Sequence, residues 1–239
     1  MVRPAAGVET HQGAQLFDAL LHPAKTVAKG AFDRLLSASV TRARRLGLIG
    51  QGHEPTAAID ATGIKTRHAS LHFQRRVGRL KQPVWHSAWP KLTAVFDAAT
   101  QLITGVVVGF GPTQDSPQFA PAIRQAAANL RPIRVLADKG YDAEHNHVLC
   151  RQKLGIRRTA IPINPRSAGR RWPKARYRRM MKRRFPKVKY RQRAQAESGF
   201  SRHKRRLGSA LTARQRDSQL REMRLRVIAH NLMILADVQ

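Results

Sequence analysis

The stretch LTAVFDAATQLITGVVVGFG, residues 92–111, is the part of the sequence that decides the fold. It holds two apolar segments, and the second is rich in β-branched residues, which favour strands. Between them, Asp97–Gln101 has the small and polar composition of a turn. Two strands joined by so short a turn predict a β-hairpin.

The residues on either side of this hairpin predict a larger sheet. On the N-terminal side, the short apolar run Ala57–Ile59 stops at Asp60, which predicts a strand with an acid at its exit. On the C-terminal side, helical and extended patterns alternate. We expect a helix from Ser116 to Leu130, a strand in IRVLADKG (133–140), a helix from about Ala143 to Leu154 with Asp142 as its N-cap, and a strand at 157–164. This order predicts an α/β fold with a mixed sheet flanked by helices.

Three more segments have helical spacing. Residues 31–50 predict a helix that ends at a glycine, and residues 190–208 predict a second one. The basic segment that precedes the second helix, residues 165–189, holds 12 Lys or Arg and no acid, and it shows little strand signal. The chain closes with a helix whose predicted wide buried face comprises Leu220, Met223, Leu225, Ile228, Leu232 and Leu235.

Composition restricts the partner of the protein. The 239 residues include 45 Lys and Arg against 14 acids, so the net charge is +31, while an apolar fraction of 42% is sufficient for a core. Clustered cations gain free energy by releasing the counterions of nucleic acid, which makes a nucleic acid the first candidate partner and an anionic membrane surface the second. No apolar run approaches the roughly 20 residues that a membrane span requires. The single cysteine, Cys150, excludes an internal disulfide, and we expect a cytoplasmic or nucleoid location.

Two acids end predicted strands and precede small or turn residues: Asp60 in AAIDATG and Asp138 in VLADKGYD. Side chains at strand ends beside a loop are a common way for an α/β sheet to build a site. The alternative is that each aspartate serves only to cap a turn.

A third acid, Glu197, lies among six Lys and Arg in YRQRAQAESGFSRHKRRLG (190–208). On a helix with about 100° per residue, Tyr190, Arg193, Glu197 and Lys204 share a stripe roughly 60° wide. The simplest alternative to a functional role is an i, i+4 ion pair between Arg193 and Glu197, which stabilises an exposed helix by a few tenths of a kcal/mol.

Considered together, Asp60, Asp138 and Glu197 predict a metal centre. Mg²⁺ and Mn²⁺ prefer oxygen ligands, often two or three carboxylates together with water and phosphate oxygens. Two such ions about 4 Å apart can activate a water or a 3′-hydroxyl and stabilise the leaving oxygen in attack on a phosphodiester. The surrounding cations would attract the DNA and offset repulsion between the acids.

At these residues the sequence resembles the bacterial insertion-sequence transposases of the DDE type. The late helix matches the Y-x2-R-x3-E-x6-K signature at Tyr190, Arg193, Glu197 and Lys204, while AIDATGIK and LADKGYD resemble the segments that hold the first and second aspartates of that family. The likeness extends from about Thr56 to Leu235. It implies an RNase H-like fold, with three antiparallel strands followed by parallel strands and flanking helices. It also implies that Asp60, Asp138 and Glu197 bind two Mg²⁺ (or Mn²⁺) ions.

The resemblance also implies DNA contacts and a division of the chain. Tyr190, Arg193 and Lys204 would contact phosphates of the transposon end. The basic insert 165–189 would contact the DNA backbone, and its candidate residues are Arg171, Lys174 and Arg178. Residues 56–239 would form the catalytic domain. Residues 1–55 would be a short N-terminal segment with one helix, either a minimal end-recognition region or the remainder of a larger DNA-binding region.

These expectations describe a DNA transposase that cuts at transposon ends and joins them to target DNA, binding double-stranded DNA as a homodimer. Two alternatives stay open at this stage. One is a basic nucleic-acid-binding protein without catalysis, derived from a transposase. The other is a nuclease on the same fold that lacks strand transfer. Convergence of the three carboxylates would separate the first alternative from an enzyme.

Overall fold

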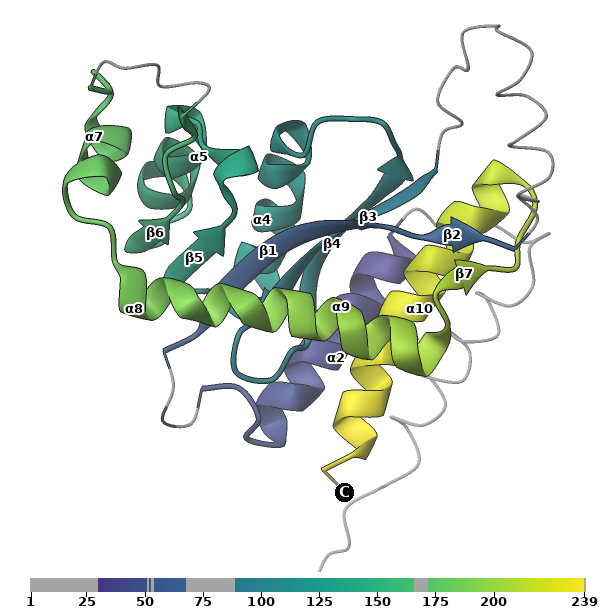
Figure 1. The fold of residues 1–239 in the computed structure, drawn as a ribbon. Coiled ribbons are helices and arrows are strands. Elements are labelled where there is room, and N and C mark those ends of the chain that lie inside the picture. Colours follow the sequence, from purple (N-terminus) through teal and green to yellow (C-terminus); the bar gives the residue numbers. More distant parts are fainter. Residues whose placement is uncertain (1–29, 51, 53, 68–88, 166–171, 239) are drawn as a thin grey trace, which may run out of the picture.

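A five-stranded sheet forms the centre of the protein (Figure 1). The structure is a computed structural model that describes residues 30–50, 52, 54–67, 89–165 and 172–238. The strand order is β4-β3-β1-β5-β6; β1, β3 and β4 are antiparallel, and β5 and β6 run parallel to β1. The expected mixed sheet is therefore confirmed. Its strands are β1 (Thr56–Gly63), β3 (Pro90–Asp97), β4 (Ile103–Phe110), β5 (Arg134–Ala137) and β6 (Arg158–Ala160).

The hairpin predicted from residues 92–111 is formed by β3 and β4. Its turn is held by Asp97, a buried residue whose Oδ2 accepts hydrogen bonds from the Thr100 backbone N–H at 3.1 Å and from Thr100 Oγ1 at 2.8 Å. These bonds satisfy polar groups at the tight connection, which fixes the register of the two strands.

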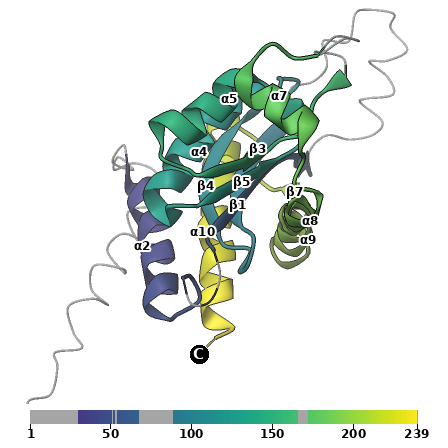
Figure 2. The same ribbon diagram turned by 90° about the vertical axis from the view of Figure 1, so that its left-hand side faces the viewer.

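Helices cover both faces of the sheet, and Figure 2 shows α4 and α9 on opposite sides of it. One buried cluster includes Ile59, Val95 and Phe119, and the other includes Ala58, Phe96 and Phe200. Because side chains alternate along a strand, odd and even positions of β1 supply different cores. The covering helices are α4 (Ser116–Leu130) and α5 (Glu144–Val148), which continues as a π-turn at Leu149–Lys153, on one face, and α9 (Ala194–Leu207) and α10 (Arg216–Ala236) on the other.

The N-terminal helix α2 (Ala31–Arg45) packs into the same fold. Its Leu36 belongs to the core beneath α9 and α10, whereas its Val40 belongs to the core beneath α4. The helix ends at Arg45 and not at Gly50 as expected, because the chain turns at Gly47, which has a left-handed φ of 75°. Helix α2 is thus part of the folded body, and the domain boundary at residue 55 stays a prediction.

Amide side chains from two helices bond to the edge strand β4. Asn231 of α10 accepts from the Ile103 backbone N–H and donates to the Ile103 carbonyl, each at 2.8 Å. From α4, Asn129 donates to the Thr104 carbonyl at 2.9 Å and Gln125 accepts from the Val106 N–H at 2.7 Å. These bonds occupy backbone groups that a sheet edge otherwise exposes.

The buried face of α10 differs from the predicted one. Leu232 is 44% exposed, and the inward positions beside it belong to His230 and Asn231. Both polar residues bond to the β3–β4 hairpin, since His230 Nε2 lies 2.9 Å from the Gln101 carbonyl in its connection and Asn231 bonds to Ile103 in β4. A hydropathy pattern cannot identify a face whose buried members are polar and hydrogen-bonded.

The basic insert contains two short helices, α7 (Arg176–Arg183) and α8 (Lys187–Tyr190). It docks through Asp142, which was expected to cap α5. Instead Asp142 bonds to Arg178 at 2.8 and 2.9 Å and accepts from the Asn164 N–H, and Ala143 is the N-cap of α5. A small second sheet pairs β2 (Lys65–Thr66) with β7 (Ala210–Leu211). In the described part of the chain, no helix has both the length and the apolarity needed to cross a membrane.

Candidate active site

Asp60 and Asp138 lie side by side at the junction of two central strands. The parallel ladder between β1 and β5 ends with the pair Ile59–Ala137, so Asp60 and Asp138 are the next residues of each strand. Neighbouring strands are about 4.8 Å apart, which places the two backbones close together here. Each aspartate lies two residues after a side chain of the α9-facing core, Ala58 or Leu136, so both belong to that face.

The environment of Asp60 corrects one expectation. The strand does not stop at Asp60, because β1 continues to Gly63 through its pairing with β3. Only the pairing with β5 ends there. Asp138 does follow the end of β5, and its Oδ1 accepts from the Lys139 N–H at the start of a short 3₁₀ turn, Lys139–Tyr141. Turn capping is therefore one role of Asp138, and it leaves the other carboxylate oxygen available for a ligand.

Helix α9 brings Glu197 to the same face. It packs on β1 and β3 through Ala196 and Phe200, and the Phe200 ring meets Phe96 edge-on at 4.9 Å. Gly199 makes this close approach possible, because a Cβ there would lie 2.6 Å from the Phe96 ring. Tyr190 and Arg193 precede α9, in α8 and a 3₁₀ turn, so the four signature residues do not lie on one uniform helix.

Arg193 links two of the three acids. Its Nη1 lies 3.7 Å from Asp60 Oδ2, and its Nη2 forms a close ion pair with Glu197 one turn further along the chain. The i, i+4 pair considered from sequence thus exists. It is extended, however, to a carboxylate on the central strand, which a purely local pair would not reach.

The electrostatics of Asp60 link the three acids. Burial raises the pKa of the Asp60 carboxyl above its ordinary value, and the nearby charges of Glu197 and Asp138 raise it further. The Ala61 N–H, 2.9 Å from Oδ1, and the Arg193 guanidinium oppose that shift in pKa. A cation bound among these carboxylates would relieve the same repulsion.

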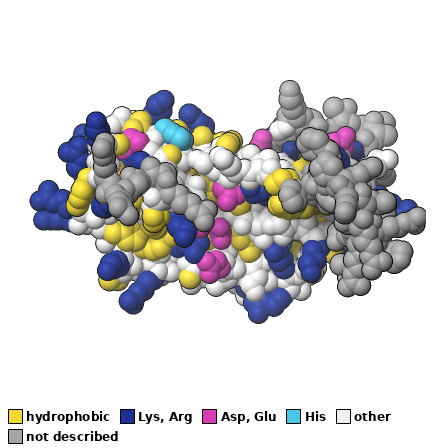
Figure 3. Space-filling model, turned by 45° about the horizontal axis from the view of Figure 1, so that its top comes forward, with side chains coloured by type: hydrophobic (Ala, Val, Ile, Leu, Met, Phe, Trp, Pro, Cys, Tyr) yellow, Lys and Arg dark blue, Asp and Glu magenta, His cyan; other side chains and the backbone are white. Residues whose placement is uncertain are grey.

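No three His, Cys, Asp or Glu side chains within the described ranges lie close enough together to hold one metal ion. The three acids share a face and influence one another electrostatically, while Arg193 lies between two of them. Their chemistry nevertheless fits a hard divalent cation, because all three offer carboxylate oxygens. Figure 3 shows acidic side chains in the middle of one face, with Lys and Arg on both sides.

The other signature residues surround this acidic centre. Lys204 Nζ donates to Thr62 Oγ1 at 2.7 Å, which anchors α9 to β1. Tyr190 is half-buried beneath the Arg193 guanidinium and meets the Phe185 ring at 4.9 Å. Burial raises the pKa of the Tyr190 phenol, and Asp138 and Asp60 contribute to that shift.

Sequence reasoning missed Thr62 and Gly199. Thr62 could have been found by alternation, since it lies two residues beyond Asp60 on the same face of β1. Gly199 carries no comparable signal, because its importance depends on the position of Phe96 in a distant strand.

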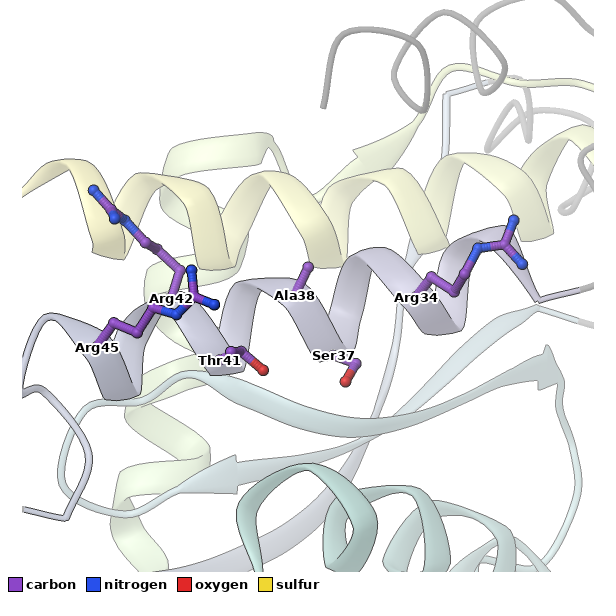
Figure 4. A pocket seen from close by; sticks show the side chains of 6 residues that line it. All are labelled: Arg34, Ser37, Ala38, Thr41, Arg42 and Arg45. Atoms are coloured by element: carbon purple, nitrogen blue, oxygen red, sulfur yellow. The ribbon is translucent and has the colours of Figure 1, made fainter. Parts of the chain in front are cut away.

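The candidate DNA contacts of the insert have different surroundings. Lys174 is exposed. Arg178 is bound to Asp142, so it joins α7 to the body of the protein. Arg171 lies outside the described residues. A further basic hollow of about 400 Å³ lies on α2, and Figure 4 shows Arg34 at one end and Arg42 and Arg45 at the other, with Ser37, Ala38 and Thr41 between them.

A mixed sheet of this order, with helices on both faces and carboxylates at its central junction, defines an RNase H-like α/β protein. Residues 51–232 match the family described as "Transposase DDE domain", and this match covers most of the 239 residues. The chain therefore belongs to the DDE transposase family, which acts on DNA and generally uses divalent metal ions. No curated protein matches the chain.

Proposed function

We propose that the protein is a DNA transposase that cleaves DNA at the ends of its mobile element and joins those ends to target DNA. The observation that carries this proposal is the adjacency of Asp60 and Asp138 at the end of the β1–β5 ladder, with Glu197 joined to Asp60 through Arg193. Membership of the transposase family and a net charge of +31 support it.

In this proposal Asp60, Asp138 and Glu197 hold two Mg²⁺ or Mn²⁺ ions. When bound, such ions supply an activated water or hydroxyl and stabilise charge on the leaving oxygen. Arg193 neutralises the acids in the free protein, and it turns toward a DNA phosphate once the carboxylates have another cation. Lys204 and Tyr190 fix α9 and position the phosphates, since chemistry of this type depends on placement and charge.

The DNA surface in this proposal extends from the acidic centre over the basic insert, where Lys174 is exposed, and over the arginines of α2. Arg171 and Arg178 are further proposed contacts. A homodimer bound to two transposon ends would bring both cuts into one complex, and the compartment would be the bacterial cytoplasm with its nucleoid.

The proposal is tested with a duplex that carries the DNA flanking the coding sequence, incubated with the protein and Mg²⁺ or Mn²⁺. Asp60→Asn, Asp138→Asn and Glu197→Gln should each reduce cleavage by about two orders of magnitude or more, since each removes a ligand charge. DNA affinity should persist or increase, because a negative charge near the phosphates is lost. Asp217→Asn, on an exposed position of α10, is the matched control. Full cleavage by all three site variants would refute the assignment.

A second candidate function is DNA binding without catalysis. It is favoured by one observation: in the described ranges, the three acids do not yet form a group able to hold a metal. A protein of this kind would bind the duplex about as tightly as the Asp60→Asn, Asp138→Asn and Glu197→Gln variants do. Neither Mg²⁺ nor Mn²⁺ would then change its thermal stability or produce cleavage.

A further inference from the structure

A second basic site lies at the opposite end of β5 from the acidic centre. It is a cavity of about 390 Å³ between the β5–β6 side of the sheet and the insert helices. Five cations line it, and no carboxylate is among its lining residues: Arg134, Arg151, Arg158, Arg184 and Lys189. The cavity shares no residue with the acidic centre.

Two of the cavity cations are held in place by the fold. Arg134 is buried and donates to Glu54 at 2.8 Å and to Thr56 Oγ1 at 3.3 Å. Arg151 donates through Nε to Thr159 Oγ1 at 3.1 Å, and its guanidinium lies 5.1 Å from the centre of the Tyr177 ring. Groups that are fixed before a ligand arrives lose little conformational entropy on binding. The positive charge of Arg151 is therefore in place before a ligand arrives, whereas that of Arg134 is paired with Glu54.

The rim adds further positive charge. Arg158, Arg184 and Lys189 are exposed. Glu54, which lies outside the cavity, is 3.4 Å from Arg158, so one carboxylate serves both Arg158 and the deeper Arg134. The sum of these charges leaves the cavity strongly cationic, which favours a ligand with phosphate groups.

Apart from Thr159, the rest of the cavity wall is apolar. Met180 and Met181 of α7, Pro186 and Ala160 complete its lining. A phosphate ion alone would gain nothing from these side chains, whereas the flat face of a nucleobase would pack against them. Cavities of roughly 300–1,000 Å³ suit small ligands, so one nucleotide fits here. A double helix does not, because its bases are stacked inside it.

The position of the cavity relates it to the acidic centre. Arg134 and Asp138 lie on the same face of the sheet, four positions apart along one extended segment, which corresponds to about 13 Å. A nucleic-acid strand that passes the acidic centre can therefore reach the cavity within a few nucleotides.

We propose that this cavity binds one nucleotide of an unpaired DNA strand. The base lies against Met180, Met181 and Pro186, and the phosphates lie on Arg158, Arg184 and Lys189. The assignment of DNA as the nucleic acid rests on the proposed function, whereas the assignment of a nucleotide rests on the cavity itself.

The test measures the affinity of the full chain for fluorescent ligands by anisotropy, in EDTA and without added metal. The ligands are a short single-stranded thymidine oligonucleotide and an abasic oligonucleotide with the same number of phosphates. The parent should bind the thymidine strand about tenfold more tightly, the usual effect of packing one base. Met180→Gln should remove most of that preference. Thymidine monophosphate, added as competitor, should displace the strand only weakly, because it lacks the neighbouring phosphates.

The charge component is tested with the double variant Arg158→Ala/Arg184→Ala against the double control Arg124→Ala/Arg221→Ala. All four arginines are exposed, so both double variants lose the same charge. The cavity variant should weaken binding of the thymidine strand by about an order of magnitude more than the control. Equal losses in the two would overturn the proposal, and so would equal affinity of the parent for the thymidine and abasic strands. Efficient displacement by thymidine monophosphate would overturn the assignment of a strand.

Failure here and failure of the proposed function give different results. A chain that cleaves DNA but shows no base preference refutes only the nucleotide cavity. A chain that shows the preference yet leaves every duplex intact with Mg²⁺ or Mn²⁺ refutes only the transposase chemistry.

Discussion

Arg193 supplies the positive charge that lies among the acids of the site. Its guanidinium contacts Asp60 from β1 and Glu197 from α9, so it holds two acids from separate elements together. Without a counter-charge, the repulsion among Asp60, Asp138 and Glu197 would oppose the docking of α9. The same arginine that resembles a DNA contact in the sequence thus also stabilises the free protein.

A substitution at Arg193 tests this dual role. Arg193→Gln should lower the free energy of unfolding by about 1 kcal/mol in EDTA, which corresponds to a drop in Tm of roughly 2–4 °C. Added Mg²⁺ should raise the Tm of the variant more than that of the parent, because the ions replace the missing charge. Arg191→Gln, at an exposed neighbouring position, serves as control. An identical response of both variants to Mg²⁺ would contradict this account of the acidic centre.

At the scale of elements, the docking of α9 on the sheet sets the position of Glu197. The contact is close because Gly199 faces the Phe96 ring, and a methyl group there would approach that ring to 2.6 Å. The Lys204–Thr62 bond fixes the other end of the helix. The distance between Glu197 and the two aspartates therefore depends on how closely α9 packs against β1 and β3.

Gly199→Ala should displace α9 from the sheet. We expect a loss of about 1–3 kcal/mol in the free energy of unfolding, together with a larger loss of cleavage than this destabilisation explains. The double variant Gly199→Ala/Phe96→Leu should recover part of the activity, because the smaller side chain makes room for the methyl group. Ser198→Ala, an exposed change one residue earlier in α9, should leave both measurements unaltered. If the double variant cleaves DNA no better than Gly199→Ala alone, the contact between Gly199 and Phe96 does not determine the cleavage activity.

Prediction from the sequence succeeded where periodicity is local. The hairpin at 92–111 and the helix from Ser116 to Leu130 were recovered, because strand and helix patterns act over neighbouring residues. Prediction from the sequence failed where a residue distant in the chain determines the local structure. Asp60 lies within β1, since β3 extends the strand beyond it, and Asp142 binds Arg178 from the insert, so it is not the cap of α5.

For the site too, the local contacts could be predicted from the sequence and the long-range contacts could not. The spacing of Glu197 from Arg193 gives their ion pair, which is a local property of a helix. That Asp60 joins this pair, and that Gly199 permits it, depends on how α9 crosses the sheet. No pattern within a single segment contains that information. The roles of these residues in metal binding stay predictions.

At the scale of the whole molecule, neutral histidines lie in both cores. Burial lowers the pKa of His203 to about 3 and that of His147 to about 4, and burial also lowers the pKa of His230. Neither ring nitrogen of His203 has a hydrogen-bond partner among the described residues. A charged imidazole would therefore be poorly solvated in either core.

These shifts predict that the protein loses stability in mild acid. The unfolded chain takes up protons near pH 6.5 whereas the folded chain does not, so stability is complete above that pH and falls below it. Each such histidine contributes a loss of up to about 1.4 kcal/mol per pH unit until its folded pKa is reached. Urea unfolding between about pH 7 and pH 5 measures this slope. His203→Leu should make the slope shallower, and an unchanged slope would show that His203 does not titrate on unfolding.

Edge strand β4 is protected when copies of the protein lie close together. Its backbone groups are already bonded to the side-chain amides of Asn231, Asn129 and Gln125. Copies of a strongly cationic protein concentrate along DNA, where two bare strand edges would readily merge into one continuous sheet and grow into fibrils. With those backbone groups already occupied, neighbouring copies on one DNA molecule are kept from joining edge to edge at β4.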